Sequence, residues 1–410
     1  MTNLEINEIR KILIEELEKH EGEPVLLPLE PHVLQEIIFD VVLPTKCKEF
    51  SLNLKSVLKK IDFSNVPFND VYLRLCNFEG LKGIKINPQV VYKKDLSNCK
   101  FNGVTFAGSF DGTICSNADF TGSTGVIINP QKIANKNLCK SKLSGVKFIG
   151  KFNDVLVMNA DFTGSEGAII NLAGIAGSDL SGTNLCDVTV KGNTNRLTLN
   201  YTCFKGAKTI NGEMININPQ TIKERKMIYC NFDGVYFTND FDGCTVAGSN
   251  FKGSEGAIIN AQKLKDKSLI GTVLSNVTLE GNFDNVRVNN ADFTGSIGAV
   301  INPQTVYDKN LTNSIFHSVT FDGFFDNCKI KNSNFTGSIN AIINPRSIYC
   351  RNLINVNLTD AIVVDNFKGL FLTDNMVMCQ KENLIDDNYN NMYEDTKKEY
   401  VIRMIKSLFK

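Results

Sequence analysis

The sequence has no tryptophan, only three histidines and no net charge, since 44 basic residues balance 44 acidic ones among its 410 residues. A balanced charge gives no general attraction to nucleic acid or to an anionic membrane, because such attraction needs clustered excess charge. The histidines, His20, His32 and His317, lie far apart in the sequence and form no ligand pattern for a metal. We therefore expect neither direct binding to nucleic acid or membrane nor a metal site.

Long apolar runs are also missing. No stretch approaches the roughly 20 apolar residues that a membrane helix requires. Near the N-terminus, acidic residues interrupt the apolar ones where a signal peptide needs an unbroken apolar segment. These residues are Glu5, Glu8, Glu15 and Glu16. We expect a cytoplasmic protein.

The motifs of common enzymes are absent as well. There is no glycine-rich phosphate loop, no His-Glu-x-x-His and no Gly-x-Ser-x-Gly, so we expect no catalytic residues, no cofactor and no enzymatic activity. The twelve cysteines contain no Cys-x-x-Cys pair. Four of them stand two residues before a large apolar residue, which predicts reduced thiols on the inward side of a strand. These four are Cys76, Cys99, Cys230 and Cys328.

A repeat of 42 residues is the main feature that the sequence does contain. It is marked by glycines that recur at this interval, with one interval of 47 residues between Gly206 and Gly253. The full set is Gly80, Gly122, Gly164, Gly206, Gly253, Gly295 and Gly337. A fixed period in this range predicts a solenoid, in which each unit buries its apolar face by stacking on its neighbours.

Large apolar residues inside each copy are mostly five positions apart. The copy at Gly295 gives Ile301, Val306, Leu311, Phe316, Phe321, Phe325, Ile330 and Phe335. A step of five fits neither a helix nor a plain strand, but it fits a chain that runs straight, turns a corner and repeats. We expect these anchors to point inward, so that Phe148, Phe237 and Phe321 are buried.

The repeat resembles the pentapeptide-repeat family, whose motif is a small residue, Asp or Asn, Leu or Phe, and two variable residues. Matching strings are Ala118-Asp119-Phe120, Ala160-Asp161-Phe162, Ala291-Asp292-Phe293, Ser249-Asn250-Phe251 and Ser333-Asn334-Phe335. The resemblance covers roughly residues 60 to 375. It implies an all-β solenoid, a right-handed β-helix of square cross-section with about 15 coils, two in each copy.

Two departures from the plain repeat need an interpretation. One is a recurring Asn-Pro-Gln string, which suits either a corner of the coil or the start of a short helical turn; we favour the corner. It occurs at Asn87, Asn129, Asn218 and Asn302. The other is a five-residue insertion, interpreted as an external loop and a candidate interaction site. It comprises Asn211, Gly212, Glu213, Met214 and Ile215.

The ends of a solenoid need covering, because open strand edges and apolar cores promote aggregation. The sequence predicts a helical cap over residues 1–48, the β-helix over 49–378, and a linker with an amphipathic helix over 379–410. The apolar stripe of that last helix is Val401, Met404, Ile405 and Leu408. This helix is either a cap or a dimerisation element, and the stripe is a second candidate interaction site.

Three functions are compatible with this sequence. The first is a non-catalytic scaffold that binds a protein partner through its outer faces. The resemblance suggests two others: a DNA mimic that binds DNA gyrase or another topoisomerase, and the β-helix module of a bacterial effector. Neutral composition argues against wholesale DNA mimicry, and only Cys379 follows the last copy, so no catalytic cysteine region is expected there.

Overall fold

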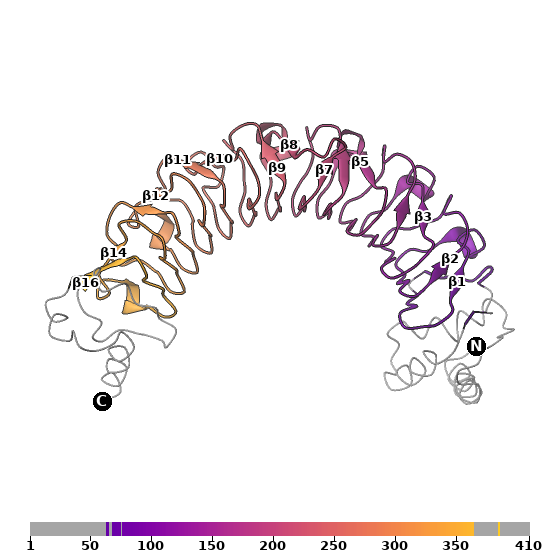
Figure 1. Ribbon diagram of the computed structural model, residues 1–410, viewed down its shortest axis with the longest axis horizontal. Helices are drawn as coiled ribbons and strands as arrows, with labels where there is room; N and C mark the ends of the chain where they lie inside the picture. The colour runs from indigo at the N-terminus through magenta and orange to yellow at the C-terminus, as the bar shows by residue number, and fades with distance from the viewer. Residues whose placement is uncertain (1–62, 65–67, 75, 365–383, 386–410) are drawn as a thin grey trace, which may run out of the picture. The chain divides into compact units, whose positions relative to one another are not determined.

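Parallel strands of two or three residues recur throughout the computed structural model, which describes residues 63–64, 68–74, 76–364 and 384–385 (Figure 1). The chain forms two compact units: unit 1 holds Met1–Asn193 and Gly206–Glu213, and unit 2 holds Thr194–Lys205 and Met214–Lys410. Within them, every named strand pair is parallel. The chain is thus a parallel β-solenoid of about 14 turns with little helix, which confirms the expected all-β solenoid.

Seven strands belong to unit 1 and are ordered β1-β2, β3-β4 and β5-β6-β7. They are β1 Lys85–Ile86, β2 Thr105–Phe106, β3 Ile127–Ile128, β4 Lys147–Phe148, β5 Ile169–Asn171, β6 Thr189–Lys191 and β7 Lys208–Thr209. Strands are this short because the chain turns a corner after each one. Isolated parallel bridges, such as Lys100 with Asp119, join successive turns on the other faces.

Nine strands belong to unit 2 and are ordered β8-β9, β10-β11, β12-β13 and β14-β15-β16. They are β8 Ile215–Ile217, β9 Val235–Phe237, β10 Ile258–Asn260, β11 Thr278–Glu280, β12 Val300–Ile301, β13 Thr320–Phe321, β14 Ile342–Ile343, β15 Ile362–Val364 and β16 Leu384–Ile385.

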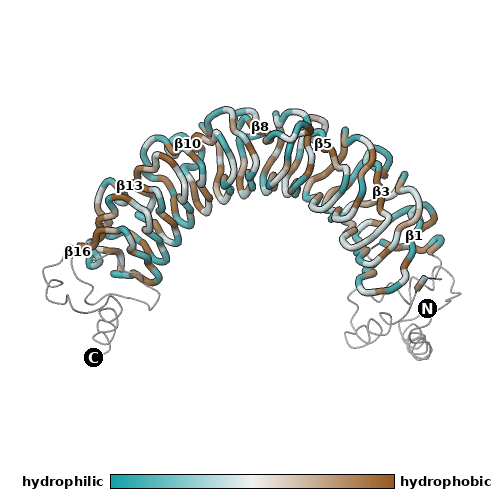
Figure 2. The backbone as a smooth tube through the Cα atoms, viewed as in Figure 1, coloured by the Kyte–Doolittle hydropathy of each residue, from teal (hydrophilic) through white to brown (hydrophobic). Residues whose placement is uncertain are grey.

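The five-residue anchors form the core. Phe148, Phe237 and Phe321 are all buried, at most 3% exposed, which confirms that the anchors point inward. Anchors one turn apart stack on each other: the ring of Phe316 lies 5.8 Å from Phe293 and 5.3 Å from Phe335. Each such burial contributes roughly 2 to 3 kcal/mol. Figure 2 shows the result, with apolar and polar residues alternating within the turns.

The cysteines in register with the anchors are buried too. Cys76, Cys99, Cys230 and Cys328 lie in the core, as their spacing predicts, and none of the described cysteines forms a disulfide. Loss of solvation raises the pKa of the Cys230 and Cys328 thiols to about 12. These thiols therefore stay protonated and serve as small apolar groups.

The Asn-Pro-Gln string is a corner stabilised by its own asparagine. The Asn side chain accepts the backbone N–H of the Gln two residues later, over 2.9 to 3.1 Å in the four copies. The apolar step continues through the corner, since Ile133 after Asn129 is buried. The corner interpretation is therefore confirmed, although one copy also forms a short 3₁₀ turn with proline at its first position, η7 (Pro219–Thr221).

The glutamine of this string joins two turns of the solenoid. Its side-chain amide donates to two backbone carbonyls on the next turn, 20 and 22 residues later, over 2.5 to 3.3 Å. We call this arrangement the glutamine clamp. It is made by Gln89, Gln131, Gln220 and Gln304 of the four strings and by Gln262 of the related string Asn260-Ala261-Gln262, which together are all the glutamines of the described residues. The clamp adds side-chain hydrogen bonds between turns at a corner, where the chain has left the strand and its backbone pairing.

A second corner of the repeat has left-handed backbone. At Lys93 and Lys94 the φ angles are 51° and 49°, so this turn resembles a type I′ β-turn rather than a helix. Related turns recur with other residues at the centre, such as Asn135, Asp308 and Cys350. The short elements at or next to this corner are η3 Tyr92–Lys94, η4 Ala134–Lys136, η5 Leu172–Gly174, η6 Ala176–Ser178, η8 Lys223–Arg225, η9 Tyr307–Lys309 and η10 Tyr349–Arg351.

Several predictions concern residues that the structure does not describe. The helical cap over 1–48 and the C-terminal stripe Val401, Met404, Ile405 and Leu408 lie outside the described residues. None of the helices in the described part has the length and apolarity needed to span a bilayer.

Candidate interaction surfaces

One face of unit 2 carries a row of outward apolar and threonine side chains, which we call the apolar column. Its members are linked by backbone pairing from turn to turn: Ile258 pairs with Thr278, Thr278 with Ile297, Val300 with Thr320, Thr320 with Ile339, and Ile342 with Ile362. The column is therefore Ile258, Thr278, Ile297, Val300, Thr320, Ile339, Ile342 and Ile362. It arises because strand residues alternate in direction, so the neighbours Ile259 and Ile301 point into the core.

The column is open to solvent. Ile297 and Ile339 are 62% and 54% exposed, and Val300 and Ile258 are 45% and 41% exposed. Phe324, which is 61% exposed, bridges to Ile342 and extends the apolar surface sideways. Single exposed apolar residues are ordinary on protein surfaces, but a contiguous row of them marks a surface for interaction.

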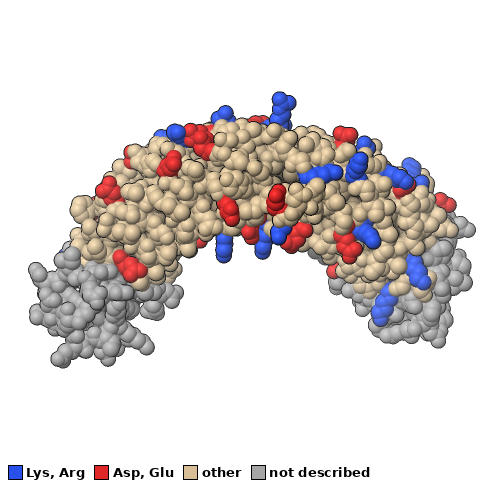
Figure 3. Space-filling model, turned by 45° about the horizontal axis from the view of Figure 1, so that its top comes forward, with Lys and Arg blue, Asp and Glu red and all other residues tan. Residues whose placement is uncertain are grey.

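The charged residues that lie next to the column members in the sequence have one sign. Along the chain, the charged residues within two positions of any member are Glu280, Asp322 and Asp360, and no lysine or arginine lies within that range. In Figure 3, the charged side chains visible over the C-terminal part are mostly acidic and widely spaced. The column is thus an apolar strip with an acidic margin.

The same row in unit 1 is interrupted by charge. Its outward residues are Lys85, Thr105, Thr124, Ile127, Lys147, Glu166, Ile169, Thr189 and Lys208. Ile127 and Ile169, which occupy the repeat position of Ile258 and Val300, are 45% and 42% exposed. Ile127 pairs with Lys147 on the next turn, and Ile169 shares its turn with Glu166, which bridges to that same lysine. Because the backbone pattern is the same, unit 1 supplies a matched control surface for the apolar column.

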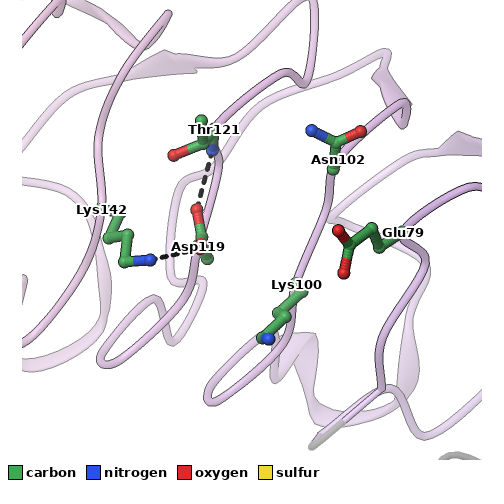
Figure 4. Close-up of a pocket in the computed structure, with 6 residues that line it drawn as sticks. All are labelled: Glu79, Lys100, Asn102, Asp119, Thr121 and Lys142. Atoms are coloured by element: carbon green, nitrogen blue, oxygen red, sulfur yellow. Dashed lines mark hydrogen bonds and ion pairs between the residues drawn. The ribbon is translucent and has the colours of Figure 1, made fainter.

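A shallow hollow of about 260 Å³ in unit 1 is lined by Glu79, Lys100, Asn102, Asp119, Thr121 and Lys142 (Figure 4). Lys142 forms a 3.0 Å ion pair with Asp119, whose other carboxylate oxygen accepts the Thr121 backbone N–H. Burial acts to raise the pKa of Asp119, but the bonds from Thr121 and Lys142 outweigh it and lower that pKa overall. The hollow is the space between acidic and basic side chains on successive turns.

Two stacked tyrosines form an exposed corner of unit 2. The rings of Tyr201 and Tyr229 lie 5.1 Å apart at an angle of 11°, and both are exposed. Tyr229 also lies on the backbone of Gly248, where a Cβ atom would come within 2.3 Å of the ring. Glycine at 248 therefore lets this ring lie flat along the solenoid surface.

The predicted insertion site is only partly a loop. Asn211, Gly212 and Glu213 are exposed in a turn after β7, closed by a bond from the Thr209 N–H to the Glu213 carbonyl. Met214 is half-buried. Ile215 is buried and begins β8, so its assignment to an external loop was wrong. The chain returns to the strand one residue earlier than the insertion suggested, because the side chain of Ile215 fills the core.

The apolar column was not identified from the sequence, although a signal exists. The long corner carries two successive large residues, as in Ile169-Ile170 and Ile258-Ile259, and alternation requires one of each pair to face outward. The turn-to-turn register then decides which outward residues become neighbours.

Among the described residues, no cluster of three or more His, Cys, Asp and Glu side chains could hold a metal ion.

No protein-family model matches the chain, and no match was found among curated proteins.

Proposed function

We propose that this chain is a pentapeptide-repeat protein, a right-handed β-helix of square cross-section, that acts as a non-catalytic scaffold and binds a protein partner. The proposal for the fold rests on the in-phase pentapeptide strings and on four buried anchors per turn, as in Phe316, Phe321, Phe325 and Ile330. Free thiols suit a reducing compartment, which supports a cytoplasmic location.

The apolar column is the single observation that carries the binding function. A row of exposed isoleucine and valine on a rigid strand face offers area for burial without ordering a flexible loop. Its acidic margin favours a partner segment that is apolar on one side and basic at its borders. By contrast, lysine and aspartate alternate along one row of unit 1, which consists of Lys100, Asp119, Lys142 and Asp161. DNA mimicry needs an acidic surface, so this row of alternating charge does not favour DNA mimicry over protein binding.

The test compares two double variants of the full chain. In the first, Ile258→Lys and Val300→Lys place charge in the column. In the second, Ile127→Lys and Ile169→Lys make the same change at the equivalent positions of unit 1. Lysine is tolerated on this face, because Lys85, Lys147 and Lys208 already point outward there.

Proteins retained by each tagged chain from a lysate of its own cells are identified, and the candidate partner is then purified and titrated against both variants. We expect the partner to bind the wild-type chain and the unit 1 variant, and to lose at least tenfold in affinity for the column variant. Equal binding to both variants, or no partner that distinguishes them, would refute the proposal.

A further inference from the structure

We propose that the last residues of this chain, 394–410, bind the apolar column of the same molecule as an internal ligand that a partner must displace. This inference rests on the proposed function, because it assigns regulation to the same surface. The column identifies what such a ligand needs: an apolar stripe to cover the exposed isoleucines and basic residues to meet the acidic margin.

The path of the chain brings its last described strand to the sheet that carries the end of the column. Strand β16 pairs with β15, which pairs with β14, and Ile342 and Ile362 of the column belong to β14 and β15. The chain therefore leaves its last described strand, at Ile385, on the same sheet that carries the column. Twenty-five residues follow Ile385 in the 410-residue sequence.

The composition of this segment complements the column. Its sequence stripe of Val401, Met404, Ile405 and Leu408 has the spacing of an amphipathic helix. Basic residues outnumber acidic ones between 394 and 410. The basic ones are Lys397, Lys398, Arg403, Lys406 and Lys410, and the acidic ones are Glu394, Asp395 and Glu399. An apolar stripe with basic borders suits a strip that is apolar with Glu280, Asp322 and Asp360 beside it.

The length of this segment also agrees with the distances along the column. In helical form the stripe would span roughly 10 Å at about 1.5 Å per residue. Ile297 and Ile339 are two turns apart, roughly 10 Å at the usual strand spacing. The residues between Ile385 and Val401 can extend to roughly 50 Å at about 3.3 Å per residue, which exceeds the roughly 25 Å from Ile362 to Ile258. The segment can therefore reach Ile297, Val300 and Ile339, where the column is most exposed.

Photo-crosslinking of the full chain tests the contact. Benzoylphenylalanine in place of Ile297 reports on the column, and the same group in place of Ile127 is the control. We expect crosslinks from position 297 to peptides within 394–410 in the monomeric fraction, and none from position 127. The double variant Met404→Asp, Ile405→Asp should abolish them. Crosslinks confined to a dimer would show that a second copy supplies the segment, and their absence would show that nothing docks; either result overturns the proposal.

A binding measurement separates this inference from the proposed function. A labelled synthetic peptide of residues 394–410 is titrated against the wild-type chain, the Met404→Asp, Ile405→Asp variant, and that variant carrying Ile258→Lys and Val300→Lys. A tethered ligand competes at high effective concentration. We therefore expect at least tenfold tighter peptide binding when the stripe is mutated, and loss of binding when the column is also mutated. Equal affinity of the peptide for the wild-type chain and the stripe variant overturns the proposed internal ligand. In that case, loss of partner binding only in the column variant would still support the scaffold function.

Discussion

Removal of a glutamine clamp provides a direct test of how successive turns are held together. Gln304 is half-buried, and its amide donates to the carbonyls of Phe324 and Asp326 over 2.9 and 2.8 Å. A typical hydrogen bond contributes about 1 kcal/mol net, so Gln304→Ala should lower the free energy of unfolding by about 2 kcal/mol. Replacing Gln220, Gln262 and Gln304 together should lower it by about 6 kcal/mol, since sites two turns apart are nearly additive.

Urea denaturation followed by circular dichroism measures the total effect, and hydrogen exchange over residues 320–330 shows whether the loss is local. Gln304→Glu keeps the volume and the oxygen that accepts from Lys309 Nζ, but it removes the donor and places a carboxylate beside two carbonyls, so it should also destabilise. The control Lys331→Ala changes an exposed residue outside the clamp and should stay within about 0.5 kcal/mol of wild type. A triple glutamine variant that loses less than about 1 kcal/mol would contradict the reasoning.

Three other perturbations have defined outcomes. Phe316→Ala should destabilise by roughly 3 to 5 kcal/mol because it leaves a cavity among stacked rings, whereas Phe324→Ala, at an exposed site, should change stability by well under 1 kcal/mol in the same denaturation assay. The lowered pKa of Asp119 means that its contribution is present above the unfolded value near 4 and is lost as pH falls through the folded value. Wild type should therefore be more stable than Asp119→Asn at pH 7, with a difference that shrinks during acid titration; a difference independent of pH would count against the ion pair. In thiol labelling mapped by mass spectrometry, exposed Cys350 should react in the native protein while buried Cys230, Cys244 and Cys328 react only on unfolding, and early labelling of those three would contradict the inward register.

The difference between the two units shows how one backbone pattern can carry different surfaces. Anchors such as Phe148 in unit 1 and Phe321 in unit 2 are equivalent and buried. Their outward neighbours, Lys147 and Thr320, are not restrained by packing and therefore differ. A solenoid of this kind keeps its core positions fixed while its outer rows are free to specify a partner.

The period of 42 residues and the five-residue steps were sufficient to predict a solenoid with Phe148, Phe237 and Phe321 inside, because apolar burial follows local spacing. The same reasoning predicted the inward cysteines and the Asn-Pro-Gln corner. It was wrong for Ile215, because an insertion changes where the strand resumes and only packing in the core decides that position. The helical ends and the stripe Val401, Met404, Ile405 and Leu408 stay predictions from the sequence.

The tertiary structure alone decided the glutamine clamps and the apolar column. Gln304 meets carbonyls 20 and 22 residues away, and Ile297 lies one turn from Thr278, so both depend on the register between turns rather than on any local string. A sequence fixes which residues alternate inward and outward, but only the stacking of turns determines which outward residues become neighbours.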